Sequence, residues 1–428
     1  MQPIPWAAVL GLSLLSMRVD AVPTGDANPN LQSLIAEALD HHPALQATKL
    51  QAEALQHGVG PAGALSDPTI RLDLNNVPTS DWDFSSTPMS GRQLGISQRL
   101  PWPGLRAARE RVAMAAAAAG AARAVDGEAQ IVHDVKHAWF DLAFLDRAIA
   151  ITGRNEELLA DFVRIAKTKY AVGGGLQQDV LKAQVSQSVL QERLIILRAK
   201  RRQAEATLNA AVNRNLDTPV AAPLKLPTTR LPFDAHELEA LALQQPALAA
   251  LGHDVEGWES VAAVARLEAR PDFELSAAYR KRDFSNDPVA GSDFVSAAIT
   301  VSIPVWRGRK EQELAVAARL NAQATQSARQ ALVLQIKLDI RRRYLQLEGH
   351  RERHRWLRTA IIPQAQQALS ASLAGYQVDQ VDFLTLLDSQ VNLLDYEVDA
   401  YGHRTEAEKI LAQIEMAVGT RLFLEETE

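Results

Sequence analysis

The residues in this chain that could do chemistry are two pairs of histidines at helical spacing. His133 and His137 are four positions apart, and so are His350 and His354. On a helix this spacing puts two side chains on one face, and imidazole nitrogens are good zinc ligands. A zinc site needs three or more ligands, and the neighbouring acidic residues do not fall on the same faces. We therefore interpret all four as solvated helix histidines.

A second histidine motif also argues against metal binding. His41 and His42 precede a proline, but a second copy of this segment carries Gln244 and Gln245 in their place. The sequence shows no Ser-His-Asp order, phosphate-binding loop or paired carboxylates. It contains no cysteine, which excludes disulfides and thiolate ligands. We expect no enzyme activity, no cofactor and no bound metal.

Composition narrows the class of protein further. The 428 residues carry a formal net charge of −6, aromatic residues make up 5%, and no basic run suggests binding to nucleic acid. No apolar run approaches the roughly 20 residues of a membrane helix. The apolar segment from Trp6 to Met17, followed by a small residue at Ala21, predicts a signal peptide over residues 1–21, although no Lys or Arg precedes it.

Two predicted β-hairpins, at 67–101 and 270–304, are the features around which the chain is organised. Pro68 corresponds to Pro271 and Pro101 to Pro304, each pair 203 positions apart (271 − 68 and 304 − 101). Each copy has two alternating segments joined by a polar loop, which is typical of a hairpin. The repeated landmarks indicate a duplicated half rather than a solenoid array.

The alternation within the hairpins predicts one apolar and one polar sheet face. Each strand is about ten residues, enough to cross a bilayer when tilted, but a half-buried soluble sheet shows the same alternation. The predicted apolar face contains Ile70, Leu72, Leu74, Leu94, Ile96, Leu100, Phe273, Leu275, Ala277, Tyr279, Val295, Ala297, Ile299, Val301 and Ile303. The charged residues predicted on the polar face are Arg71, Asp73, Arg99, Glu274 and Arg280.

The remainder of each half is predicted to be helical. In the first half we expect helices at 30–58, 105–170 and 180–212, and in the second at 234–270 and 308–376, followed by a return helix. A continuous helix over 105–170 would be about 100 Å long. Pro363 should kink the helix that contains it.

The helices are expected to form antiparallel hairpins with tips at 170–179 and 375–383. Tyr170 and Tyr376 correspond at an offset of 206 (376 − 170), so the second half has gained three residues before its tip. The return helix shows a heptad pattern typical of a coiled coil. Its expected a positions are Leu384, Val391 and Val398, and its d positions are Leu387, Leu394 and Tyr401. Residues 22–217 then form the first repeat, 218–233 a linker and 234–428 the second repeat.

This order of elements resembles the TolC family of outer-membrane factors over nearly the whole mature chain. The segments that carry the resemblance are the pair EALDHHPAL and ALALQQPAL, the junctions ISQRLPWPGLR and VSIPVWRGR, and the turns YAVGGGLQQDVLKAQ and GYQVDQVDFLTLLDSQ. The first junction is most similar to the heavy-metal branch, the CzcC- and CusC-like proteins.

The resemblance implies a mainly helical fold with a small β part. Four strands cannot close a barrel, and open sheet edges are not tolerated in lipid, so three copies are needed for a twelve-stranded barrel with a conduit. The implied protein is a homotrimer with an outer-membrane barrel on a helical periplasmic tunnel. The charged residues of the polar face would line the barrel lumen, and outer-membrane lipid would cover the apolar face. The barrel alone would anchor the chain, because the lipidated cysteine of many family members is absent.

The implied function is the exit duct of a tripartite efflux system, with a periplasmic adaptor (membrane-fusion) protein and an inner-membrane RND pump as partners. Metal cations are the favoured cargo; drug efflux and type I secretion remain alternatives, as does a soluble coiled-coil scaffold. The resemblance places the adaptor contact at Val172, Gly173, Gly174, Gly175 and Val378. It places gate candidates at Asp179, Asp379, Asp382 and Asp388, although each aspartate could instead cap a helix. Lys182 and Thr385 depart from the acidic pattern of the family.

Overall fold

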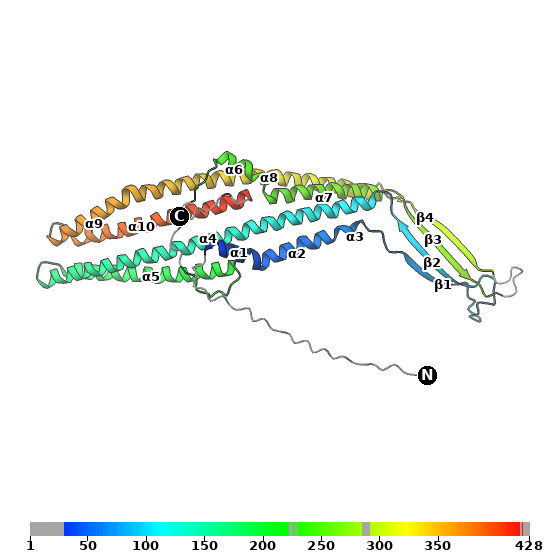
Figure 1. Ribbon diagram of the computed structural model, residues 1–428, viewed down its shortest axis with the longest axis horizontal. Helices are drawn as coiled ribbons and strands as arrows, with labels where there is room; N and C mark the ends of the chain where they lie inside the picture. The colour runs from blue at the N-terminus through cyan, green and yellow to red at the C-terminus, as the bar shows by residue number, and fades with distance from the viewer. Residues whose placement is uncertain (1–29, 222–225, 227–228, 285–291, 420–421, 423–428) are drawn as a thin grey trace, which may run out of the picture.

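The structure is a computed structural model that describes residues 30–221, 226, 229–284, 292–419 and 422. The predicted signal segment at 1–21 lies outside the described residues. The chain forms a long rod with a β-sheet at one end and the tips of two helical hairpins at the other (Figure 1). Two short helices, α1 (Leu31–His41) and α6 (Ala235–Ala242), lie beside the middle of the rod.

The same order of elements occurs in both halves. The first half contains α1, α2 (Pro43–His57), α3 (Val59–Gly63), β1 (Thr69–Asn75), β2 (Gly91–Leu100), α4 (Leu105–Ala171) and α5 (Gln177–Ala211). The second half contains α6, α7 (Pro246–Glu268), β3 (Asp272–Lys281), β4 (Phe294–Ser302), α8 (Glu311–Trp356), the π-helical turn η1 (Leu357–Ile361), α9 (Ile362–Gln377) and α10 (Phe383–Val418).

Helix α4 confirms the long helix predicted after the first hairpin. It is 67 residues without interruption, which corresponds to about 100 Å at 1.5 Å per residue. Alanine, the best helix former, dominates its first third, and the helix contains no proline. None of the helices in the described part of the chain combines the length and hydropathy that a membrane-spanning helix requires.

Two helices predicted as continuous are broken by proline. The expected helix at 30–58 stops at His42, which has extended φ and ψ of −70° and 119°, and α2 restarts at Pro43. The expected helix at 234–270 is likewise interrupted at Gln245 before Pro246. Proline cannot donate a helical hydrogen bond and disfavours helical geometry in the preceding residue. Both predictions were therefore wrong at their proline, and the break recurs at the corresponding place in each half.

The helix that contains Pro363 includes a π-helical turn, where the sequence predicted a kink. The turn at 357–361 ends two residues before the proline, and the N–H of Ile362 donates to the carbonyl of Leu357, five residues back. The wider turn relieves the clash that the proline ring would make in a regular α-helix.

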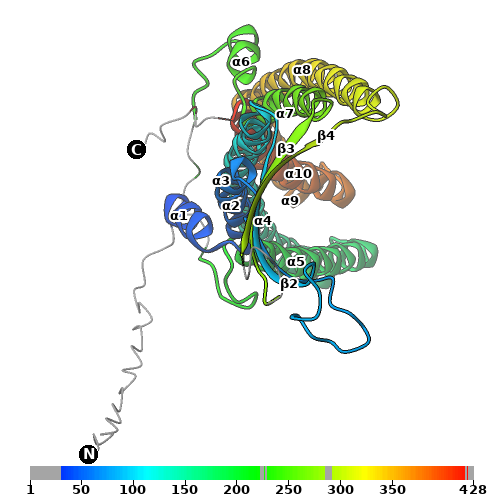
Figure 2. The same cartoon turned by 90° about the vertical axis from the view of Figure 1, so that its right-hand side faces the viewer.

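The strands confirm both hairpins and place them in one sheet. Among the described residues, four strands pair antiparallel in the order β1-β2-β3-β4. The pairing of β2 with β3 joins the two halves, with Arg99 opposite Glu274. Viewed along the rod, the sheet is a curved arc (Figure 2). β1 and β4 are its edges.

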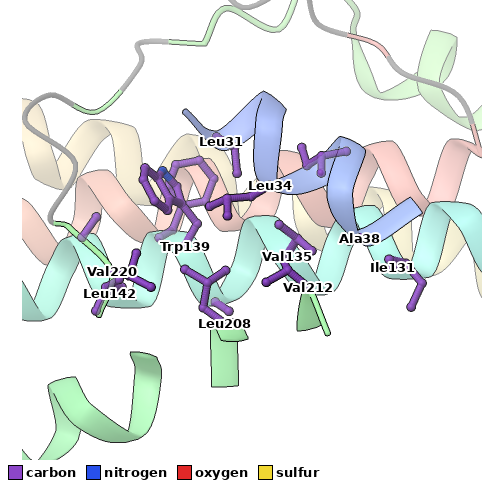
Figure 3. Packing of buried hydrophobic residues seen from close by; sticks show 14 of the residues in the cluster. Leu31, Leu34, Ala38, Ile131, Val135, Trp139, Leu142, Leu208, Val212 and Val220 are labelled. Atoms are coloured by element: carbon purple, nitrogen blue, oxygen red, sulfur yellow. The ribbon is translucent and has the colours of Figure 1, made fainter. Parts of the chain in front are cut away.

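The best-packed region of the first half lies where α1 crosses α4 and α5. Leu34 of α1, Val135 of α4 and Leu208 of α5 are fully buried there, and Trp139 closes the cluster (Figure 3). The second half repeats the arrangement with α6 packed on α8 and α10. A third cluster fills the space between the two helical hairpins towards their tips.

The heptad prediction for α10 is correct at the d positions and, among the a positions, at Val398, which is buried. Leu387 and Leu394 are buried and Tyr401 is half-buried, as expected, but Leu384 and Val391 are 47% and 42% exposed in the single chain. The buried stripe also includes the residues that directly precede the predicted a and d positions, among them Phe383, Leu386, Gln390 and Leu393. The helix packs against α4, α8 and α9 together, so its apolar stripe is broader than a two-helix seam.

Candidate functional site: the helical tips and the sheet

The two hairpin tips are built on the same turn. Gly173 has a φ of +79° and its counterpart Asp379 a φ of +61°. In the first tip the N–H of Gly174 donates to the carbonyl of Lys169 at 2.9 Å. In the second tip the N–H of Gln380 donates to that of Gly375, also at 2.9 Å. Both are Schellman caps, in which the left-handed residue ends the helix.

A lysine from the first tip joins it to the second. Lys169 Nζ lies 2.6 Å from Asp379 Oδ1 and donates to the carbonyl of Tyr376 at 2.5 Å. The ammonium also lies 4.6 Å from the centroid of the Tyr376 ring. The lysine side chain is 14% exposed and the aspartate 69% exposed. The link therefore combines an ion pair, a cation–π contact and a hydrogen bond to the C-terminal end of α9.

Tyr376 is the buried centre of this contact. It is 4% exposed and packs against Phe383, with ring centroids 5.2 Å apart. Its hydroxyl donates to Asp179 Oδ2 over a long 3.4 Å. Burial, followed by the negative charge of Asp179, raises the pKa of Tyr376 to about 12. Tyr376 thus remains neutral, and able to donate, at any physiological pH.

The four predicted gate aspartates divide into three groups. Asp179 and Asp379 are brought together through Tyr376 and Lys169. Asp382 caps α10 by accepting from the N–H of Thr385 at 3.0 Å. Hydrogen bonding to the Thr385 side chain, followed by this backbone hydrogen bond, lowers the pKa of Asp382. Asp388 is exposed on α10, and its carboxylate has no ion pair or hydrogen bond among the described residues.

The predicted adaptor-contact residues form the end of the rod. Val172 and Val378, which correspond in the two repeats, are 77% and 63% exposed. Gly173 supplies the left-handed backbone, and a Cβ on Gly175 would lie 2.9 Å from the backbone nitrogen of Tyr170. Two of the tip glycines are therefore required by turn geometry, while the valines present apolar surface to solvent.

Sequence reasoning missed Lys169 and the asymmetry between the two tyrosines. Tyr170 is 49% exposed, although its counterpart Tyr376 is buried. The sequence signal for this link is that the two repeats carry different residues at two corresponding positions. Lys169 corresponds to Gly375, and Gly173 corresponds to Asp379. A lysine and an aspartate that each replace glycine in the other repeat favour a contact between repeats.

The five predicted lumen residues all lie on one face of the sheet. Arg71 Nε donates to Asp73 Oδ1 at 2.9 Å within β1. The register brings Asp73, Gln93 and Arg280 into one row, where Arg280 Nε donates to Gln93 Oε1 at 3.0 Å. Charges of both signs are therefore spread over this face.

The opposite face is apolar and exposed. The register aligns Ile70 with Ile96, and Leu72, which is 80% exposed, with Leu94. Further rows join Leu275 to Ile299 and Tyr279 to Val295. At the end of the sheet nearest the helices, Trp102 stacks on Phe273 with ring centroids 6.1 Å apart. An exposed apolar band with aromatic residues towards its ends is typical of a sheet that faces lipid.

The histidines have closer partners than predicted. His133 contacts Asp134 at 2.9 Å, while His350 Nδ1 lies 2.9 Å from His403 Nδ1. His354 Nδ1 lies 2.7 Å from the carbonyl of Ala400. All four are half-buried and not simply solvated, because α10 packs against both α4, which carries His133 and His137, and α8, which carries His350 and His354. In the described part of the chain, no three or more His, Cys, Asp or Glu side chains are placed to hold a metal.

Comparisons with known proteins agree with this architecture. The sequence matches the family model described as "Outer membrane efflux protein" over residues 34–214. None of the curated proteins is similar enough in sequence to match the chain.

Solved structures match the fold over nearly its full length. The outer membrane protein VceC from Vibrio cholerae is 19% identical, with a TM-score of 0.78 and coverage of 92% of this chain and 96% of its own. The MtrE outer membrane channel from Neisseria gonorrhoeae is 18% identical, with a TM-score of 0.76 and coverages of 94% and 91%. CusC is 14% identical, with a TM-score of 0.78 and coverages of 91% and 92%. The family model thus matches the first repeat of the chain, and the solved outer-membrane channels share the fold of both repeats.

Proposed function

We propose that this chain forms the outer-membrane exit duct of a tripartite efflux system. The observation that carries the proposal is the four-stranded sheet, apolar on one face and charged on the other, at the end of helices about 100 Å long. The sheet would lie in the outer membrane, and the helices would extend through the periplasm as a tunnel.

The sheet needs further copies to close. β1 and β4 are edge strands, and unpaired backbone groups are not tolerated in lipid. Two copies would give an eight-stranded barrel, whose interior is filled by side chains. Three copies give a twelve-stranded barrel, which leaves a channel. The functional unit is therefore a homotrimer in which β4 of one chain pairs with β1 of the next. Arg71, Asp73, Arg99, Glu274 and Arg280 then face the water-filled lumen.

The linked tips are proposed as the gate. Lys169 and Tyr376 hold the second hairpin against the first at the end of the rod farthest from the sheet. Breaking this contact frees α9 and α10 to move relative to α4 and α5. The exposed Val172 and Val378 lie at the same end, where a periplasmic adaptor protein would dock and shift the balance towards the open arrangement. An inner-membrane RND pump would supply the cargo, and the duct itself would be passive.

The proposed cargo is a metal cation. The strand–helix junction from Ile96 to Arg106 resembles the heavy-metal branch of the family, and Asp388 adds an unpaired carboxylate on α10 in the described structure. In a trimer this residue occurs three times, and rings of carboxylates at a constriction favour cations.

Membrane fractionation and planar-bilayer recording test the duct. The protein should resist carbonate and salt, require detergent for release, and form conducting trimers. Release by carbonate as a soluble species would contradict membrane insertion. Gly173→Asp should leave the trimer intact but abolish crosslinking to the adaptor; crosslinking at the wild-type level would remove the tip from the docking surface.

The cargo is tested in a strain that lacks the gene. Loss of the duct should lower tolerance to divalent transition metals, and expression of the wild-type chain should restore it. A strain sensitised only to organic drugs would contradict the metal assignment and leave the duct itself intact.

A further inference from the structure

A cavity of about 430 Å³ lies where the first repeat passes from sheet to helix. Its walls include Gly63, Leu65, Leu100, Trp102, Arg106 and Glu110. These residues come from the end of α3, the end of β2 and the first turns of α4. The volume falls within the roughly 300–1,000 Å³ of small-molecule sites.

One wall of the cavity continues the apolar face of the sheet. Leu100 is paired with Phe273, which is in turn paired with Val301, so the three form one row of that face. Trp102 stacks on Phe273, and the guanidinium of Arg270 lies 5.9 Å from the tryptophan ring. Tryptophan and arginine at the end of an apolar band mark the level of lipid head groups. With the membrane placement of the proposed function, on which this argument rests, the cavity opens towards the periplasmic leaflet.

The other wall carries one positive and one negative side chain. Arg106 Nε donates to the carbonyl of Gly63 at 2.7 Å, which fixes the guanidinium but leaves its terminal nitrogens unbonded among the described residues. Glu110 follows one turn later, and its carboxylate has no hydrogen bond or ion pair in the described structure. The two groups are not close enough to pair with each other.

The N-terminus of α4 adds to the positive side of this wall. The preceding Gly104 has no side chain to cap the helix. The N–H of Leu105 donates to the carbonyl of Trp102 at 3.0 Å, which leaves the N–H groups of Arg106 and Ala107 available to an anion, and the helix dipole also favours an anion there. A ligand with a phosphate and an ammonium separated by a few atoms would satisfy both Arg106 and Glu110.

We propose that this cavity binds the zwitterionic head group of a phospholipid such as phosphatidylethanolamine. The phosphate lies against Arg106 and the start of α4, the ammonium lies against Glu110, and the acyl chains run over Leu100 and Phe273. A lipid with an uncharged glycerol head group leaves Glu110 without a cation and binds more weakly.

The second repeat provides a natural comparison. At the offset of 203 positions, Arg309 and Glu313 match Arg106 and Glu110 in sequence, but Arg309 precedes α8 instead of lying in its first turn, and Arg266 stands in place of Gly63. A Cβ on Gly63 would already lie 3.1 Å from Glu110 Oε2, so a side chain there enters the cavity. The absence of a side chain at Gly63 thus opens the site in the first repeat, giving one site per chain and three per trimer.

The test is native mass spectrometry of trimers released from bilayers that contain equal amounts of phosphatidylethanolamine and phosphatidylglycerol. Wild-type trimers should retain up to three phosphatidylethanolamine molecules. Arg106→Gln should reduce retention about tenfold, and Glu110→Gln should remove the preference over phosphatidylglycerol. Gly63→Val should empty the site. The control variants Arg309→Gln and Glu313→Gln should behave as wild type.

Conductance of the same samples separates the two proposals. Trimers that insert and conduct but retain no lipid, or that respond equally to the variants and their controls, overturn the lipid site alone. Retention of both lipids equally by the wild type also overturns it. Failure of the protein to insert at all overturns the proposed function and the lipid site together.

Discussion

Lys169 at the end of α4 and Asp379 in the turn after α9 form an ion pair of 2.6 Å between the two repeats. Asp379 occupies a left-handed position where the first repeat has Gly173. A non-glycine residue with this backbone conformation carries strain, which the surrounding structure must offset. The ion pair between the Asp379 carboxylate and Lys169 is the interaction that offsets this strain.

Replacing Asp379 with glycine should release the second tip without damaging its turn. Glycine adopts the positive φ easily, so the expected change is loss of the charged contact, about 1–3 kcal/mol per chain. Bilayer recordings should show more frequent opening than in wild type. Asp379→Asn, which keeps a polar side chain without the charge, should give a smaller effect. Unchanged closed times in Asp379→Gly would show that the link does not hold the mouth.

Tyr376 should make opening sensitive to alkaline pH. The linked arrangement raises the pKa of Tyr376 from 10.0 to about 12, so it holds the phenolic proton more tightly than an arrangement with the tyrosine in water. Its stabilisation is fully present below pH 10 and is lost as pH rises through 12, amounting to at most about 3 kcal/mol. Conductance should therefore increase between pH 10 and 12 in wild type. Tyr376→Phe should lack this increase, and the same pH response in the variant would assign it to another group.

Charged residues should be tolerated on only one face of the sheet. Leu72→Arg or Ile299→Arg would place a charge in lipid at about 2–4 kcal/mol per chain, in all three copies. Thr300→Arg, on the polar face next to Ile299, is the matched control. Heat-resistant trimers on gels should be lost in the first two variants and kept in the third. Equal assembly of all three would mean that the faces are assigned wrongly.

Asp388 should dominate cation binding at the mouth. Asp379 is neutralised by Lys169 and Asp382 is held as a helix cap, whereas Asp388 has no partner in the described residues. Conducting trimers should favour cations and be blocked by di- or trivalent ions from the periplasmic side only. Asp388→Asn should weaken this block more than Asp379→Asn does. Equal block in wild type and both variants would place the acidic ring elsewhere.

A buried ion pair near the middle of the rod should be important for stability. Lys136 Nζ and Glu415 Oε2 lie 2.5 Å apart, with side chains 13% and 8% exposed. Lys136→Met would leave the glutamate buried without its partner, at a cost of about 3–5 kcal/mol. Denaturant unfolding should detect this loss, and the double variant Lys136→Met with Glu415→Leu should recover most of it. A single variant as stable as the double would contradict the coupling.

The sequence alone predicted the hairpins, the long helix and both tips, because alternation, alanine content and glycine-rich turns act locally. The breaks at Pro43 and Pro246 are also local, because proline ends a helix wherever it falls inside one. The link at Lys169 could not be predicted in the same way. It depends on how two hairpins more than 200 positions apart pack together, and its one signal in the sequence is the difference between the repeats at Lys169 and Asp379.

The burial of α10 shows the same limit. A seven-residue repeat predicts which residues occupy the a and d positions of a helix, but it does not say how many helices will pack against them. Leu384 and Val391 remain exposed in the single chain, and a second chain is the natural candidate to cover them. The division of the strand residues between an apolar and a polar face was predictable because a strand has only two sides.

The π-helical turn before Pro363 makes α9 differ from its counterpart in the first repeat. Helix α4 runs from the sheet to its tip as one α-helix, whereas the helical run of the second repeat, Glu311–Gln377, is equally long but is divided by η1. A π-helical turn holds more residues than an α-helical turn, so it changes the direction of the side chains that follow it. Equivalent residues beyond the turn can therefore point in different directions, as Tyr170 and Tyr376 do. One π-helical turn thus makes two repeats of the same fold end in unequal tips.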